Sequence, residues 1–319
     1  MKACAAALAL CLPLAAVAGD LGITRCVNLG DALDTPSVEG EWGYTIETRD
    51  IEMIVAAGFD TVRLPVRFSS RWEGDRIEPA FLARVDAVIR GALDRGLIVI
   101  LDLHHYEPLM ADPAGEAQTF AAIWAALGAH YAGWPDGLYF ELLNEPSGAM
   151  TTDVAAPMFA EIIAGLRPAH PDRWIIVSGG DWGNIDQMLT LPDFGPRTAH
   201  SFHYYSPFEF THQQVPWHES PMPARGWDAA TGAAAVKAEI ARARQSEAPL
   251  FLGEFGTYRK VDPESRMAWL ATVRRTAEEA DIGWCAWSFA SNFGLVTHDK
   301  RAWLPGVTEA LGLRSAEER

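Results

Sequence analysis

Short apolar runs recur eight times along this chain, and longer amphipathic segments separate most of them. This alternation is typical of repeated β-α units, in which each buried parallel strand is followed by a helix that packs on the sheet. We therefore expect strands at 23–29, 60–66, 97–103, 137–143, 173–178, 199–204, 249–253 and 282–288. The helices are expected at 79–94, 116–131, 154–167, 228–246 and 263–280.

Eight such units favour one closed α/β barrel, the (β/α)8 or TIM fold. An open, doubly wound sheet is the alternative, but no strand is followed by the glycine-rich phosphate turn of that class. The 319 residues suffice for one barrel, and no linker or internal repeat marks a second domain. We expect residues 19–319 to form this single domain.

The first 18 residues have the features of a secretory signal peptide. Lys2 precedes an apolar stretch, and the small residues 16–18 form a cleavage motif before Gly19. A membrane anchor fits less well, because the apolar stretch is short and contains Pro13. We expect residues 1–18 to be removed and the protein to be exported to an extracellular or periplasmic location, with no membrane attachment.

Two of the four cysteines, Cys4 and Cys11, lie in this signal segment, which leaves Cys26 and Cys285 in an oxidising compartment. Each lies in an apolar strand run, where a free cysteine usually behaves as a small core residue. A closed barrel makes the first and last strands neighbours, so a disulfide is the other possibility.

The charge balance limits the classes of partner. The chain has 42 acidic and 26 basic side chains and a formal charge of −16 at pH 7. A nucleic acid would be repelled, and no cluster of Lys and Arg offers phosphate contacts. A neutral polymer remains a suitable partner, and we expect the protein to act as a monomer.

Polar residues stand where the predicted strands end, and in a barrel these ends meet at one rim. Glu145 and Glu254 each end an apolar run, where an ionised carboxylate needs a compensating partner. Two carboxylates across a cleft are what glycosidic bond hydrolysis requires. Other strands carry or end in Arg63, His104, His105, Asn144, His203, Tyr205 and Trp287.

Seven segments, taken together and in order, resemble glycoside hydrolase family 5, the retaining cellulases and mannanases built on a (β/α)8 barrel. They are NLGDALDTPSVEGEWG, AGFDTVRLPVRF, LDLHHYEPL, FELLNEP, SFHYYSPFEFTHQ, LGEFGTYRK and AWSF. The resemblance covers essentially the whole mature chain. It implies a secreted endo-β-1,4-glycanase, endoglucanase-like, that needs no cofactor or metal and also acts on lichenan or glucomannan; a β-mannanase is the alternative.

The resemblance also assigns the two acids. Glu145 corresponds to the general acid/base and Glu254 to the nucleophile of a double displacement. Arg63 and the hydroxyl of Tyr205 are expected to stabilise the anion of Glu254 and lower its pKa. Glu145, which lacks a guanidinium partner and is partly desolvated, is expected to keep its proton.

The remaining site residues are predicted to bind sugar or support the acids. Asn144 is expected to contact the sugar 2-hydroxyl and His203 to support the acid/base. His105 is less simple, because adjacent strand residues face opposite sides of a sheet. The predicted substrate-binding residues are His104, His105, Trp287, Trp217, Asp31 and Asp34. Members of the family usually read NLGNAL with an acid three positions on, whereas this chain has Asp31 and Asp34 in that segment.

The other tryptophans divide by position. Trp42 and Trp182 lie in loops, where a tryptophan either packs or binds sugar. The tryptophans within predicted strands and helices are expected in the core: Trp124, Trp174, Trp269 and Trp284.

Two other functions compete with this interpretation. A metal-dependent hydrolase would place the histidines and glutamates around one ion, but barrel enzymes of that class use His-x-His on one strand, which this sequence lacks. A non-catalytic sugar-binding barrel generally loses one carboxylate, and both remain here.

Overall fold

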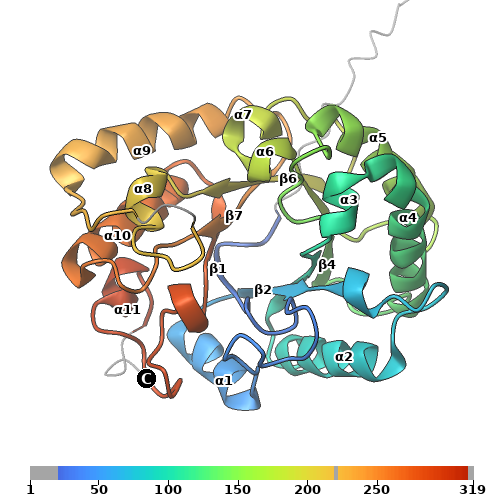
Figure 1. Cartoon of the computed structure of the whole chain (residues 1–319), viewed down its shortest axis with the longest axis horizontal. Coiled ribbons are helices and arrows are strands. Elements are labelled where there is room, and N and C mark those ends of the chain that lie inside the picture. The colour runs from blue at the N-terminus through green and yellow to red at the C-terminus, as the bar shows by residue number, and fades with distance from the viewer. Residues whose placement is uncertain (1–20, 219–221, 315–319) are drawn as a thin grey trace, which may run out of the picture.

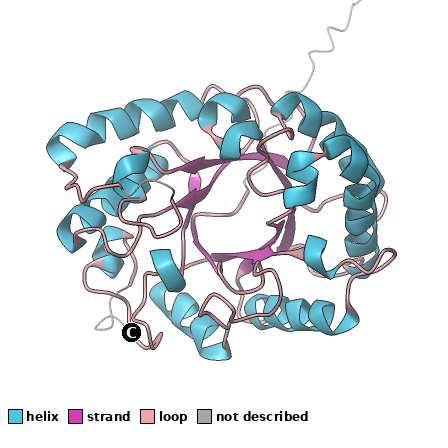
Figure 2. Cartoon of the chain, in the orientation of Figure 1, coloured by secondary structure: helices cyan, strands magenta, loops and turns pink. Residues whose placement is uncertain are grey.

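The structure, a computed structural model, describes residues 21–218 and 222–314. The predicted signal peptide, residues 1–18, lies outside the described residues. Eight parallel strands close into a barrel in which each strand pairs with the next and β8 returns to β1. Figure 2 shows this ring of strands at the centre with the helices around it. The predicted (β/α)8 fold is confirmed.

The strands are shorter than predicted at most ends. They are β1 (Arg25–Asn28), β2 (Thr61–Val66), β3 (Ile98–Leu103), β4 (Leu138–Glu141), β5 (Ile175–Ser178), β6 (Thr198–Tyr204), β7 (Leu250–Phe255) and β8 (Gly283–Ala286).

All five predicted helices are present, within a few residues of the expected bounds. They are α2 (Pro79–Leu93), α4 (Pro113–His130), α5 (Thr152–Leu166), α9 (Ala229–Ala243) and α10 (Pro263–Glu279). Local signals start several of them. Asp112 and Asp262 each cap the first turn of a helix, α4 and α10, and a proline follows at the first helical position.

One full helix and several short ones were not predicted from the sequence. The missed elements are α1 (Thr48–Ala57), η1 (Phe68–Arg71), α3 (Glu107–Ala111), α6 (Gly180–Gly183), α7 (Ile185–Met188), α8 (Phe208–Thr211), η2 (Ser291–Phe293) and α11 (Val307–Ala310). In Figure 1 several of the short ones, such as α3, α6 and α8, lie over the mouth side of the ring, where the loops that follow the strands are found.

The barrel interior changes character along its axis. Toward the strand starts it is apolar, where Cys26, Ile100, Ile176, Phe251 and Cys285 belong to one buried cluster. Two residues further along the strands, inward positions become polar, because side chains alternate between the two faces of a strand. The second layer holds Asn28, Arg63, Asp102, Glu141 and Ser178. Glu145 and Glu254, the two predicted acids, come further along β4 and β7 than this layer.

A disulfide links Cys26 to Cys285 and joins the first strand to the last. The two residues are paired directly in the β1–β8 register. The interpretation of both cysteines as free core thiols was therefore wrong, because closure of the barrel places them face to face.

Strand β7 contains a bulge. Its pairing with β6 runs Phe202–Leu252 and then His203–Glu254, so Gly253 is an extra residue on β7. Phe251 and Glu254 both reach the barrel interior although they are three residues apart, which regular alternation does not allow. The bulge thus turns Glu254 into the barrel.

In the described ranges, residues 21–218 and 222–314, no helix has the length and apolar character that crossing a membrane requires.

Candidate active site

Glu145 and Glu254 meet at the carboxyl end of the barrel. Glu145 follows β4 in a left-handed conformation, with φ of 44°, and Glu254 lies in β7. Nδ1 of His203 is 2.8 Å from Oε1 of Glu145 and 3.6 Å from Oε2 of Glu254. One carboxylate oxygen from each glutamate and a ring nitrogen of His203 lie within 4.8 Å of one another. The structure therefore brings together the two predicted acids and the predicted supporting histidine.

Arg63 organises the layer beneath them. Its side chain is fully buried, and Nη1 donates to Oε1 of Glu254 at 2.8 Å. Nε and Nη2 donate to the two carboxylate oxygens of Glu141 at 2.7 and 3.0 Å, and Nη2 lies 2.9 Å from Oδ2 of Asp102. One guanidinium thus faces three buried carboxylates, two of which, Asp102 and Glu141, were not predicted.

Arg63 also contacts two asparagines. Nη1 donates to Oδ1 of Asn28 at 2.9 Å, and Nη2 donates to Oδ1 of Asn144 at 2.8 Å. The second contact fixes the amide of Asn144 so that its NH2 group is left to donate elsewhere. This is the orientation that the predicted contact with a sugar hydroxyl requires. Asn28, like Asp102 and Glu141, was not predicted, although each is a polar residue inside an apolar run. Asn28 and Asp102 each lie two positions after a residue of the apolar layer, Cys26 and Ile100.

Burial sets the proton affinity of the catalytic pair. It raises the pKa of Glu145 to about 7, against a smaller lowering by Arg63. It also raises the pKa of Glu254 to about 7, although His203, Arg63 and Tyr205 each lower it. Arg63 and Tyr205 thus lower the pKa of Glu254 as predicted, but desolvation outweighs them and the net pKa is raised.

Hydrogen bonding distinguishes the two acids. Glu254 accepts from Arg63 on one oxygen and from the hydroxyl of Tyr205, at 2.8 Å, on the other. Burial beside Glu254 raises the pKa of Tyr205 well above its usual range, so the phenol stays a donor. A carboxylate that accepts a bond on each oxygen is stabilised as the anion. The proton shared by the pair is therefore better placed on Glu145.

His104 and His105 lie side by side. Their ring centroids are 4.6 Å apart, and the ring of His104 also stacks on Trp287 at 5.4 Å and 3°. Strand alternation does not separate His105 from His104, because β3 ends at Leu103 and the chain has left the strand. A ring nitrogen of each lies within 4.8 Å of a carboxylate oxygen of Asp34, so both histidines face the same part of the site.

The two aspartates after β1 occupy different surroundings. Asp34 is fully buried, and its carboxylate accepts the backbone N–H of Asp31 at 3.0 Å and of Ala32 at 2.7 Å. Burial raises its pKa to about 7. Burial also raises the pKa of Asp31, against hydrogen bonds from Ser291 and the backbone of Asn292. Asp34 lies beside His104 and His105, whereas Asp31 turns toward η2.

The predicted sugar platforms lie on the same side of the barrel. Trp287 is half-buried and stacked on His104, as above. Trp217 is 55% exposed and packs against Tyr258 and Phe293, and Phe293 in turn contacts Tyr205. Trp217 therefore stands at the edge of the site, separated from Tyr205 by one ring.

The two tryptophans left open by the sequence are exposed near the site. The ring of Trp42 meets His105 edge-on at 5.9 Å. Trp182 is 61% exposed, and its backbone N–H donates to the carbonyl of Pro146, next to Glu145. The tryptophans predicted to lie in the core are all buried: Trp124, Trp174, Trp269 and Trp284.

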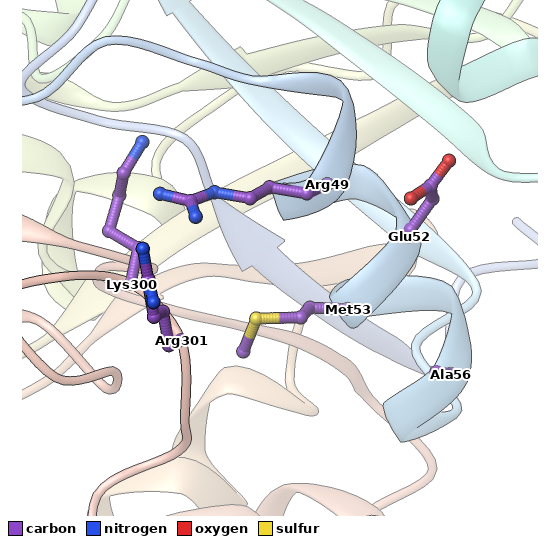
Figure 3. Close-up of a pocket in the computed structure, with 6 residues that line it drawn as sticks. All are labelled: Arg49, Glu52, Met53, Ala56, Lys300 and Arg301. Carbon is purple, nitrogen blue, oxygen red and sulfur yellow. The ribbon is translucent and has the colours of Figure 1, made fainter.

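A groove between α1 and the loop at 299–301 lies on another part of the molecule and is lined by Arg49, Glu52, Met53, Ala56, Lys300 and Arg301 (Figure 3). Its basic residues already have acidic partners: Arg49 pairs with Glu47, and Lys300 pairs with Asp50. Glu52 is the one acid among these lining residues, so this groove does not offer the pair of carboxyl groups that Glu145 and Glu254 supply.

Comparison with known proteins agrees with this geometry. The family model described as Cellulase (glycosyl hydrolase family 5) matches residues 28–293. The chain belongs to glycosyl hydrolase family 5. It is therefore a glycoside hydrolase, and neither a metal-dependent hydrolase nor a non-catalytic barrel is the better interpretation.

Several relatives are endoglucanases by name. Endoglucanase H of Acetivibrio thermocellus is 27% identical over 89% of this chain, although the chain spans only about a third, 32%, of that longer protein. Endoglucanase C of the same organism is 26% identical, over 86% of this chain and 94% of its own length.

Solved structures resemble the whole barrel. Thermotoga maritima Cel5A in complex with cellobiose has a TM-score of 0.86 and 35% identity, over 91% of this chain and 97% of that one. The cellulose synthase subunit Z of Clostridioides difficile has a TM-score of 0.87 and 32% identity, over 91% of this chain and 99% of that one.

Proposed function

We propose that this protein is an exported endo-β-1,4-glucanase that cleaves glucan chains with net retention of anomeric configuration. The observation that carries the proposal is the approach of Glu145 and Glu254, whose nearest ligand oxygens lie within 4.8 Å of one another around His203. Retaining enzymes hold their two carboxyl groups about 5–5.5 Å apart, whereas inverting enzymes need about 6.5–9.5 Å for a water.

In the first step, a carboxylate oxygen of Glu254 attacks the anomeric carbon while Glu145 gives its proton to the departing glycosidic oxygen. The product is a glycosyl ester of Glu254 and a shortened chain. In the second step, Glu145 takes a proton from water, whose oxygen attacks the same carbon and releases Glu254. The first step needs Glu145 protonated and Glu254 ionised, as the hydrogen bonds of Glu254 favour. The second step needs Glu145 ionised, the state in which the first step leaves it.

Glucan is the substrate that the relatives support. The endoglucanases of Acetivibrio thermocellus and the cellobiose complex of Thermotoga Cel5A point to β-1,4-glucan. A mannotriose complex of the same Thermotoga enzyme supports mannan or glucomannan as the second candidate. Lichenan is included because its β-1,4 bonds are chemically the same.

Export is part of the proposal, and the exported protein is expected to be a monomer. The signal-like segment at residues 1–18 supports export, and so does the Cys26–Cys285 disulfide, since disulfides persist in oxidising compartments. The expected location is the periplasm or the extracellular medium.

Azide rescue tests the assignment of the two acids. Glu254→Ala should lose turnover by several orders of magnitude, and azide in the vacated space should restore part of it as an α-glycosyl azide, inverted relative to the β-linked substrate. Glu145→Ala should instead yield the β-glycosyl azide, because Glu254 still forms the glycosyl ester. Products of the opposite configuration would reverse the roles.

Substrate class and stereochemistry need two further measurements. Reducing-end release from carboxymethylcellulose, lichenan, glucomannan and mannan ranks the polymers, and we expect carboxymethylcellulose and lichenan to lead. Proton NMR of the first product should show the β-anomer before mutarotation. Early α-anomer would exclude the retaining mechanism.

A further inference from the structure

A second group of ligand-type side chains lies outside the catalytic pair. A carboxylate oxygen of Asp34 and a ring nitrogen from each of His104 and His105 lie within 4.8 Å of one another. A carboxylate and two imidazoles suit divalent first-row metals such as Zn²⁺. We propose that Asp34, His104 and His105 bind Zn²⁺ or a similar divalent metal, and that metal and sugar compete for this part of the cleft.

The spacing is within reach of an ion. Nitrogen and oxygen ligands lie about 2.0–2.2 Å from a tetrahedral Zn²⁺, which places them about 3.3–3.6 Å from one another. The three ligand atoms, which lie within 4.8 Å of one another, therefore need to approach by at most about 1.5 Å, which side-chain rotation can supply.

His104 is already held as a metal-binding imidazole would be. Its Nδ1 lies 2.5 Å from Oδ2 of Asp102, which leaves Nε2 as the nitrogen for a ligand. Its ring is also stacked on Trp287. Metal-binding histidines generally bond a carboxylate or a carbonyl through the second nitrogen, because this fixes the tautomer and the ring orientation.

The other two ligands are fixed by the backbone. The hydroxyl of Ser69 donates to the carbonyl of His105 at 2.6 Å, which anchors that residue beyond the end of β3. The N–H groups of Asp31 and Ala32 each bond one oxygen of Asp34. Each carboxylate oxygen has a second lone pair, so both can still coordinate an ion.

Charge distinguishes this group from the catalytic one. Glu145, His203 and Glu254 also lie within 4.8 Å of one another, but there Arg63 is 2.8 Å from Glu254 and would oppose a cation. Asp34 has no such cation on its oxygens, which accept only backbone N–H groups among the described hydrogen bonds, and Asp31 adds a second acid nearby. Arg63 and Arg67 also act on His104 and His105. Neither arginine pairs with Asp34 among the described ion pairs, so a divalent ion is better accommodated at Asp34 than at Glu254.

Calorimetry with the metal alone tests binding independently of catalysis. Protein stripped with a chelator and dialysed is titrated with ZnCl2, and we expect one Zn²⁺ per chain. Asp34→Asn and His105→Asn should each weaken binding at least about tenfold. Glu254→Gln removes a carboxylate of the catalytic group, and His130→Asn removes an exposed histidine that contacts Asp86. Neither of these should change the affinity.

Circular dichroism on each variant checks that it is folded, and the visible spectrum of bound Co²⁺ reports the ligand set. Loss of the Co²⁺ bands in Asp34→Asn but not in His130→Asn would support the proposal. No heat with Zn²⁺ would overturn it. Binding that His130→Asn or Glu254→Gln removes, while Asp34→Asn does not, would overturn it equally.

The competition between Zn²⁺ and sugar rests on the proposed function, so a separate experiment tests it. Zn²⁺ should raise the KM for carboxymethylcellulose and leave kcat unchanged, and cellobiose should weaken Zn²⁺ binding to Glu254→Gln. A wild-type protein that binds Zn²⁺ yet hydrolyses no polymer would sink the proposed function and leave the metal site standing. Active protein that binds no Zn²⁺ would do the reverse.

Discussion

Arg63 faces Asp102, Glu141 and Glu254 at once, and all four side chains are buried. One positive charge does not compensate three negative ones in a poorly solvated interior. Burial accordingly raises the pKa of Asp102 to about 7 and raises that of Glu141. Burial thus favours the protonated forms of the acids in this layer, as it does for Glu145, the predicted general acid.

This proton uptake makes stability depend on pH. Burial raises the pKa of Glu145 from 4.5 to about 7, so between these values the folded protein holds a proton that the unfolded chain releases. The stabilisation that goes with this proton is complete below pH 4.5 and is lost as pH rises to 7. We expect Glu145→Gln to gain in melting temperature relative to wild type across this range, on the order of 2–4 °C.

The comparison is made by calorimetric melting at several pH values between 4 and 8. Glu161→Gln, an exposed substitution on α5, is the matched control and should follow the wild-type curve. A constant difference between Glu145→Gln and wild type at all pH values would show that Glu145 is not the group that takes up the proton.

At this scale the sequence predicted the acids but not their setting. Glu145 and Glu254 were found because each ends an apolar run and lies in a recognisable motif. Asp102, Glu141 and Asn28 were missed because each lies inside such a run, and their importance appears only when the closed barrel turns them toward Arg63. The net rise in the pKa of Glu254 was also not predicted, since desolvation depends on burial, which local sequence does not give.

At the scale of elements, the bulge in β7 determines where the nucleophile points. Gly253 is its extra residue, and a Cβ there would lie 2.6 Å from Oγ of Ser201 and 2.9 Å from Nε2 of His203. Both neighbours are buried and His203 is held by Glu145, so neither has room to withdraw. The position therefore requires glycine.

We expect Gly253→Ala to reduce kcat/KM by about 10- to 100-fold, because it displaces His203 and Glu254 from their shared geometry. Steady-state kinetics on a soluble polymer measure the loss, and circular dichroism confirms the fold. Gly91→Ala is the matched control. It lies in α2 with nothing within 4 Å of an added Cβ, and it should leave activity unchanged and stability equal or slightly higher. Full activity in Gly253→Ala would show that the bulge does not position the nucleophile.

The elements themselves were predictable to different degrees. Long amphipathic helices such as α2 and α10 were found because a proline marks the start of each, and Asp262 also caps α10. α1 was missed although Gly58 ends it in a left-handed conformation, because its cap is formed by Glu47 and Asp50 rather than by the preferred residues. The short helices over the mouth have too few turns for periodicity to be visible, and contacts with neighbouring loops determine them.

For the whole molecule, closure is the central event. The β1–β8 pairing completes the ring, which orders the apolar layer below and the charged layer above. The Cys26–Cys285 disulfide joins residues 259 positions apart in the sequence and links β1 to β8 within the apolar layer. It holds together the two ends of the chain that a barrel must join last, and it does so away from the catalytic carboxylates.

We expect Cys26→Ala/Cys285→Ala to lower the free energy of unfolding by about 2–5 kcal/mol, because the unfolded chain regains the freedom that the bridge removes. Urea denaturation measures this loss, and activity at 25 °C should persist, since the sulfurs lie below the Arg63 layer. If lost chain constraint is the cause, each single variant should lose nearly as much as the double. In wild-type protein unfolded in guanidinium, the number of titratable thiols should rise by two per chain on reduction. If reduction leaves this number unchanged, and the double variant has the urea midpoint of wild type, the strands close without this bridge.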